Sequence, residues 1–152
     1  MFTGPMIMQG YHNLPDETAK AITANGYFRT GDLGHLDADG YLFITGRKKD
    51  VIIVSGEKVY PREIEEILIQ HPAIGEAAVL GRKDESRGEA VVAFVVPREG
   101  HEVTIDTVRN HLRERNVVNW KIPKDVFVEK DLPRSPTGKV LKRELAARLT
   151  SA

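Results

Sequence analysis

The chain reads Val51-Ile52-Ile53-Val54-Ser55-Gly56-Glu57-Lys58-Val59-Tyr60-Pro61 where scattered turn residues give way to regular patterns. Two β-rich runs flank Ser55-Gly56-Glu57, and this arrangement predicts a short β-hairpin. Pro61 follows directly, and proline is tolerated in the first turn of a helix because the N–H there has no partner within the helix. The stretch therefore predicts a hairpin that leads straight into a helix.

The residues after Pro61 have the periodicity of a helix with one buried face. Ile64, Ile67 and Leu68 follow the i, i+3, i+4 spacing that such a helix requires. His71-Pro72 should end the helix, because the residue before a proline is disfavoured in the helical region.

Further strands and helices are predicted down the rest of the chain. They are strands over 74–80, 89–96 and 126–129, a polar loop over 81–88, a helix that Thr104 caps, and a terminal helix over 140–149. Elements mixed in this order predict a small α+β domain, in which helices pack on a short three-stranded sheet and the β-hairpin is added to it.

Residues 1–46 have a different character, being rich in glycine and turn residues with only short apolar runs. Asp37-Ala38-Asp39-Gly40 lies between the runs 33–36 and 41–45, and an Asp-Gly pair supplies the positive φ of a tight hairpin turn. A lone hairpin is only marginally stable. We therefore interpret 1–46 as part of a β-sheet whose other strands are missing, and 47–152 as a separate α+β domain.

Composition excludes several classes of protein. Acidic and basic residues balance at 22 each, which disfavours binding to nucleic acid through bulk charge. The chain has no cysteine, so disulfides and thiolate zinc sites are excluded, and its five histidines lack metal-ligand spacing. Its apolar runs are far shorter than the roughly 20 residues that a transmembrane helix needs. We expect no metal site and a cytoplasmic location, with peripheral contact to a membrane left open.

Three segments combine residue types that suit a nucleotide or another anionic ligand. Gly26-Tyr27-Phe28-Arg29-Thr30-Gly31-Asp32 ends in a carboxylate that could bind a sugar diol, although a turn aspartate satisfying local donors would look the same. Gly46-Arg47-Lys48-Lys49-Asp50 offers an arginine for phosphate or ribose oxygens, and the nearby Gly56 could let a narrow ligand approach the backbone. A solvated charge run beside a turn is the alternative.

The third segment is Pro133-Arg134-Ser135-Pro136-Thr137-Gly138-Lys139-Val140. Its prolines stiffen the approach, its glycine permits a bend, and Lys139 is expected at the start of the terminal helix, where an ammonium could contact an anion. The segment is not a Walker loop, which needs glycine in place of Pro133 and serine or threonine in place of Val140. Taken alone, it would equally suit an exposed lysine after a proline turn.

Together, in this order and at these separations, the three segments resemble the adenylate-forming superfamily, which includes acyl-CoA synthetases, the adenylation domains of peptide synthetases, and luciferases. The resemblance extends from Gly4-Pro5 to Leu145. It implies that Asp32 binds the ribose hydroxyls of ATP and of the acyl-adenylate, and that Arg47 also contacts the nucleotide. It further implies that Lys139 is the catalytic residue, contacting the carboxylate and the α-phosphate.

The resemblance also implies that 1–46 is the β-rich tail end of a large N-terminal adenylation domain and that 47–152 is a mobile C-terminal domain, which moves between two catalytic poses. Lys49 occupies the hinge position, where lysine is an accepted variant of aspartate. Gly56 and Lys58 correspond to positions beside the tunnel for the pantetheine arm of coenzyme A, which is used in the second pose. A domain that brings Lys139 to the active site in the first pose, and the Gly56 hairpin in the second, would suit a reaction in two steps.

The function implied is ATP-dependent, AMP-forming ligation of a fatty acid to coenzyme A, with Mg²⁺ accompanying ATP. The phosphate loop and the acyl pocket of the family are absent from this chain, so we expect a fragment that is inactive alone and holds no bound cofactor. Its partners would be the missing N-terminal domain and, through 1–46, a second copy of the chain. The alternatives are another acid, an acyl carrier protein as acceptor, or a non-catalytic partner-binding module.

Overall fold

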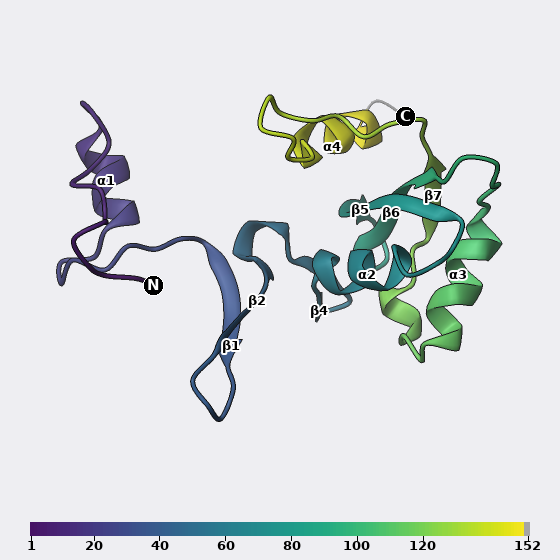
Figure 1. Cartoon of the computed structure of the whole chain (residues 1–152), viewed down its shortest axis with the longest axis horizontal. Helices are drawn as coiled ribbons and strands as arrows, with labels where there is room; N and C mark the ends of the chain where they lie inside the picture. The colour runs from purple at the N-terminus through teal and green to yellow at the C-terminus, as the bar shows by residue number, and fades with distance from the viewer. Residues whose placement is uncertain (151–152) are drawn as a thin grey trace. The chain divides into compact units, whose positions relative to one another are not determined.

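The computed structural model describes residues 1–150 and divides the chain into two compact units, which meet between Lys49 and Asp50 (Figure 1). The first unit contains α1 (Pro15–Ala21), β1 (Asp32–Leu36) and β2 (Leu42–Arg47), and the short 3-10 helix η1 (Lys48–Asp50) covers the junction. Among residues 1–150, no helix has the length and apolar character that crossing a membrane requires.

Strands β1 and β2 form the predicted hairpin, with Asp32 opposite Arg47 at the open end and Leu36 opposite Leu42 at the turn. The Asp37 carboxylate closes the turn by accepting hydrogen bonds from the backbone N–H groups of Asp39 (3.0 Å) and Tyr41 (2.8 Å). Gly40 has a φ of +85°, which glycine adopts without a steric cost. The turn chemistry read from the sequence is therefore confirmed.

Helix α1 is an addition to the predicted β-rich segment. Pro15 occupies the first turn, and the Thr18 hydroxyl donates to the Leu14 carbonyl at 2.9 Å. The helix buries none of its residues, so it has no apolar stripe by which it could have been recognised.

The first unit has no hydrophobic core of its own. No residue from Met1 to Lys49 is buried, and large apolar side chains such as Phe2 and Phe43 are about half exposed. Most of the stability of a small fold comes from burying such surface. A stable first unit therefore needs another apolar surface that covers these side chains.

The second unit is built on one five-stranded sheet. Its strands are β3 (Ile52–Val54), β4 (Glu57–Val59), β5 (Ile74–Asp84), β6 (Gly88–Pro97) and β7 (Asp125–Val128). Strand β6 is central: it pairs with β5 antiparallel along its length and with β7 in parallel. The predicted three-stranded sheet is β5, β6 and β7, and the β3–β4 hairpin joins it through the pair Val54–Gly88. The α+β class is confirmed.

The predicted loop over 81–88 is wrong in extent, because β5 continues to Asp84 and β6 begins at Gly88. The Asp84 carboxylate makes this short connection possible by accepting from the N–H groups of Ser86 (3.0 Å) and Arg87 (3.2 Å). Hydrogen bonds from the Lys124 ammonium and from Ser86 hold the pKa of Asp84 well below its usual range.

Helices cover both faces of this sheet (Figure 1). Helices α2 (Pro61–Leu68) and α3 (Ile105–Glu114) pack on one face, and α4 (Lys142–Thr150) packs on the other. Strand β6 serves both layers by alternation: Val91, Ala93 and Val95 face α2 and α3, whereas Val92 and Phe94 face α4. The helix after Thr104 is confirmed with its cap, since Thr104 and Thr107 form a reciprocal capping box.

A pair of histidines fastens α2 to α3. The buried His111 ring donates through Nε2 to the Ile67 carbonyl (2.9 Å) and accepts through Nδ1 from Arg115 (3.0 Å). His71 packs edge-on against it, with ring centroids 4.8 Å apart, and accepts from the Ala73 N–H at 3.1 Å. Burial, His111 and Arg115 together lower the pKa of His71. Both nitrogens of His111 and Nδ1 of His71 therefore make hydrogen bonds that hold the fold.

Candidate functional site

Asp32 and Arg47 lie side by side at the open end of the β1–β2 hairpin. They are register partners, and the Arg47 Nε lies 3.2 Å from Asp32 Oδ1. Gly31, with a φ of +75°, turns the chain into β1, and its carbonyl accepts from the Lys48 N–H at 2.8 Å. The sequence separates the two side chains by 15 residues, and the hairpin brings them together.

Both members of this pair keep polar atoms exposed. The Asp32 side chain is 28% exposed, and its Oδ2 makes no hydrogen bond within residues 1–150. A carboxylate oxygen in that state can accept from vicinal hydroxyls, as acidic residues do in other nucleotide sites. The Arg47 side chain, 54% exposed, keeps further N–H donors for an anion.

Lys49 lies in η1, at the junction of the two units, and its side chain is exposed. Within residues 1–150 its ammonium makes no ion pair or hydrogen bond. A hinge needs a few residues whose backbone angles can change without disrupting a packed core. The hinge role of Lys49 stays a prediction.

Gly56 and Lys58 lie at the β3–β4 turn. Ser55 and Gly56 have φ values of +51° and +88°, the positive pair that a two-residue hairpin turn requires. A Cβ on Gly56 would meet no heavy atom within 4 Å, so its backbone is open to approach. The exposed Lys58 lies opposite Ile53 in the hairpin. The turn thus presents an accessible backbone beside a cation.

Lys139 lies in a tight turn and not at the start of a helix, which corrects the prediction. The bridge between Arg134 and Val140 folds the segment back on itself, and α4 begins only at Lys142. Ser135 donates its N–H to the Lys139 carbonyl at 2.8 Å, and the Ser135 hydroxyl accepts from the Lys139 N–H at 3.2 Å. Any contribution from the α4 dipole is therefore weaker than expected, because that field falls off within the first turn.

The Lys139 ammonium is exposed and makes no ion pair or hydrogen bond within residues 1–150. Its backbone makes two hydrogen bonds to Ser135, and a third bond within the turn runs from the Gly138 N–H to the Ser135 carbonyl at 2.8 Å. An unpaired cation on an ordered turn is suited to meeting an anion that arrives from outside the unit.

Two ion pairs beside this turn were not foreseen from the sequence. Arg134 pairs with Glu76 of β5, and Lys142 pairs with Glu65 of α2 at 2.6 Å. The second pair closes around the free edge of β5, since Glu65 accepts from the Val79 N–H (2.7 Å) and Lys142 donates to the Val79 carbonyl (3.1 Å). It thereby ties α4 on one face of the sheet to α2 on the other.

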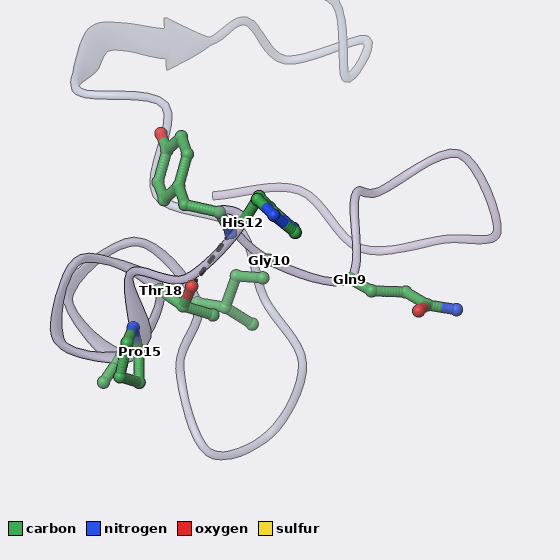
Figure 2. Close-up of a pocket in the computed structure, with 8 residues that line it drawn as sticks. Gln9, Gly10, His12, Pro15 and Thr18 are labelled. Atoms are coloured by element: carbon green, nitrogen blue, oxygen red, sulfur yellow. Dashed lines mark hydrogen bonds between the residues drawn. The ribbon is translucent and has the colours of Figure 1, made fainter.

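An open concavity of about 620 Å³ lies in the first unit, between α1 and the segment before it (Figure 2). Its lining residues are Gln9, Gly10, Tyr11, His12, Pro15, Thr18, Ala19 and Ile22. Thr18 accepts from the Tyr11 N–H at 2.9 Å and lies close enough to Gly10 that a Cβ there would clash with it at 2.8 Å. None of the predicted site residues lines this concavity.

Comparison with known proteins identifies the family and the fold. The sequence model of the AMP-binding enzyme C-terminal domain matches residues 63–139, just over half of the chain. The chain belongs to this family. The matched range begins within α2 and ends at Lys139, so it includes strands β5, β6 and β7 but not the β3–β4 hairpin.

Similarity to individual CoA ligases extends beyond the matched residues and covers nearly all of the chain. An indoleacetate–CoA ligase from Aromatoleum aromaticum is 47% identical over 150 residues, which cover 97% of this chain and 29% of that protein. A long-chain-fatty-acid–CoA ligase from Bacillus subtilis is 44% identical over 142 residues, covering 93% of this chain and 25% of that protein. The chain therefore spans under a third of the length of these relatives.

Solved structures of AMP-binding enzymes have the same fold. ATP-bound MatB from Rhodopseudomonas palustris matches with a TM-score of 0.90 and 38% identity, over 96% of this chain and 29% of that one. The o-succinylbenzoate CoA synthetase of Bacillus subtilis, in complex with its acyl-adenylate intermediate, matches with a TM-score of 0.86 and 36% identity, over 94% of this chain and 29% of that one.

Proposed function

We propose that this chain is the C-terminal portion of a cytoplasmic, ATP-dependent, AMP-forming ligase that joins a carboxylic acid to coenzyme A through an acyl-adenylate. The observation that carries the proposal is the Lys139 ammonium, which has no partner among residues 1–150 and stands on an ordered turn, in a chain that belongs to the AMP-binding enzyme C-terminal domain family. The Asp32–Arg47 pair supports it, because its free carboxylate oxygen and guanidinium donors suit a ribose and its phosphate.

The chemistry explains why an unpaired lysine is useful. A carboxylate must attack the α-phosphorus of ATP, and the two anions repel each other as they approach. A lysine placed between them offsets this repulsion and stabilises the charge that develops on the phosphoryl oxygens. Pyrophosphate then leaves, with the carboxylate oxygen bonded to the α-phosphorus of AMP. The thiolate of coenzyme A attacks the acyl carbon in a second step, and AMP is the leaving group.

Within this proposal, Gly56 and Lys58 serve the second step and Lys49 serves the movement between the steps. The open backbone at Gly56 leaves room for a narrow pantetheine arm, and the Lys58 ammonium makes no ion pair within residues 1–150. A lysine in a short 3-10 helix can absorb a change of backbone angles, because that helix is tighter and less well bonded than an α-helix.

We further propose a fatty acid as the acid substrate and coenzyme A as the acceptor. The choice rests on the resemblance of Arg47-Lys48-Lys49-Asp50 and the run 59–65 to medium- or long-chain fatty acyl-CoA synthetases. The long-chain-fatty-acid–CoA ligase relative supports this choice, whereas the indoleacetate–CoA ligase relative supports an aryl acid.

The first prediction is that a full-length protein carrying this chain forms AMP from ATP when given an acid and coenzyme A, whereas residues 1–152 alone do not. The isolated chain lacks a surface against which Asp32 and Lys139 could hold ATP. The measurement is AMP release with a panel of fatty acids of several lengths, indoleacetate and coumarate. Turnover by the isolated chain would contradict the proposal, and so would a full-length protein that is inactive with every acid.

The second prediction is that the isolated chain self-associates through its first unit. Residues 1–46 expose large apolar side chains, and burying one of them fully lowers the free energy by about 1.5–3 kcal/mol. The β1–β2 hairpin also has two strand edges without a partner strand in the described chain, and such edges can pair with another copy. Light scattering should detect a dimer or larger species. Phe43→Lys in β2 should shift it toward monomer, while Ile69→Lys beside α2, also at an exposed apolar residue, should not. A wild-type monomer at high concentration would refute this prediction.

A further inference from the structure

Arg134 connects the tip of the Lys139 turn to the sheet. Its Nη1 donates to the carbonyl of Gly138, the residue just before Lys139, at 2.7 Å. Its Nη2 donates to the Glu76 carboxylate on β5. One planar guanidinium therefore contacts both the backbone that carries the lysine and a strand of the rigid core.

The two ends of the turn are fixed independently of the Arg134 side chain. Leu132, before the turn, is 1% exposed and belongs to the core under α4, and Val140, after it, packs against the same cluster. The Leu141 N–H closes the base by donating to the Pro133 carbonyl at 2.7 Å. Between these anchors, residues 136–139 are exposed, so the ends can stay in place while the tip changes its conformation.

We propose that Arg134, anchored by Glu76, is a positioning residue that orients Lys139 for the adenylation step; this inference rests on the proposed function. The fork geometry of arginine allows two directed contacts at once, which a lysine ammonium on a flexible stem does not reproduce. A small displacement of a reacting group is costly: about 1 Å can lower a rate by about 10²-fold.

Because this ion pair is exposed to solvent, its effect on the position of Lys139 can be tested without a large effect on stability. The Arg134 and Glu76 side chains are each 38% exposed, and pairs that face solvent contribute little to the free energy of unfolding. Removing Arg134 should therefore leave the second unit folded while loosening the tip of the turn.

The experiment compares Arg134→Gln, Glu76→Gln and Arg134→Lys in the full-length ligase, with the two half-reactions measured separately. Arg134→Gln and Glu76→Gln should each lower kcat for acyl-adenylate formation by about 10-fold, and thioester formation from supplied acyl-adenylate should keep its rate. Arg134→Lys should fall between wild type and Arg134→Gln. Arg148→Gln, which removes the α4 ion pair with Glu129, is the matched control and should keep both rates.

A second readout uses the chain of residues 1–152 and does not depend on activity. Amide ¹⁵N relaxation of Gly138 and Lys139 should show lower order parameters in Arg134→Gln than in wild type, with Leu132 and Leu145 unchanged. Unchanged order at the tip, or equal losses in both half-reactions, would overturn the positioning role. If Lys139→Ala itself keeps adenylation, the proposed function is wrong; if Lys139→Ala loses adenylation and Arg134→Gln does not, only this inference is wrong.

Discussion

Replacing Lys139 by alanine in the full-length ligase should lower the rate of acyl-adenylate formation by about 10²–10³-fold, the loss typical of removing one charge-stabilising donor from a transition state. The ammonium is free of partners within residues 1–150, so its removal breaks no contact that holds the fold. The second half-reaction, thioester formation from supplied acyl-adenylate, should keep its rate, because the proposed role of Lys139 is confined to the first.

The control for this substitution is Lys130→Ala. Lys130 is also an exposed lysine of the second unit without an ion pair in the described part of the chain, and it lies outside the turn. Its loss should change neither half-reaction. The measurement is pyrophosphate release in single turnover, followed separately by thioester formation. An equal loss in both steps for Lys139→Ala would contradict a role limited to adenylation.

Local patterns were enough to predict most of the fold. The hairpin turns at Asp37–Gly40 and at Ser55-Gly56 depend on residues adjacent in sequence. Helices α2 and α3 are predicted by the periodicity of their apolar residues and by Pro61 and Thr104 at their starts. Helix α1 was missed because it buries nothing. The loop before β6 was predicted too long because polar residues after 80 resembled a connection, whereas the Asp84 carboxylate confines the turn to 85–87.

The candidate site divides in the same way. Asp32, Arg47 and Lys139 lie in segments whose resemblance to a family is local, so the sequence was sufficient to propose them, and their roles stay predictions. Arg134 lies in the same segment as Lys139, but its role could not be predicted from the sequence, because its partner Glu76 is 58 residues away. Long-range pairing of this kind has no local signal, and it requires the fold to place β5 beneath the turn.

The largest effect on stability is expected for Phe94→Ala. Phe94 is 1% exposed, stacks on Phe127 with ring centroids 4.8 Å apart, and belongs to the core cluster under α4. Truncating a buried phenylalanine removes its transfer free energy and leaves a cavity, so the free energy of unfolding of the second unit should fall by about 3–5 kcal/mol. Urea unfolding followed by the fluorescence of Trp120, the one tryptophan of the chain, reports on this unit.

Phe43→Ala is the matched control, because it makes the same chemical change at a side chain that is 50% exposed in the first unit. It should leave the Trp120 transition within about 0.5 kcal/mol of wild type, as is usual for surface positions. A shift below about 1 kcal/mol for Phe94→Ala would show that the core under α4 collapses around the cavity. Leu132 and Leu145 share that core, and the turn of Lys139 lies between them in the chain. A loosened core should therefore lower the hydrogen-exchange protection of the turn before the whole unit unfolds. Phe94→Ala should then also reduce adenylation, although Phe94 is remote from Lys139, because it disorders the base of the turn.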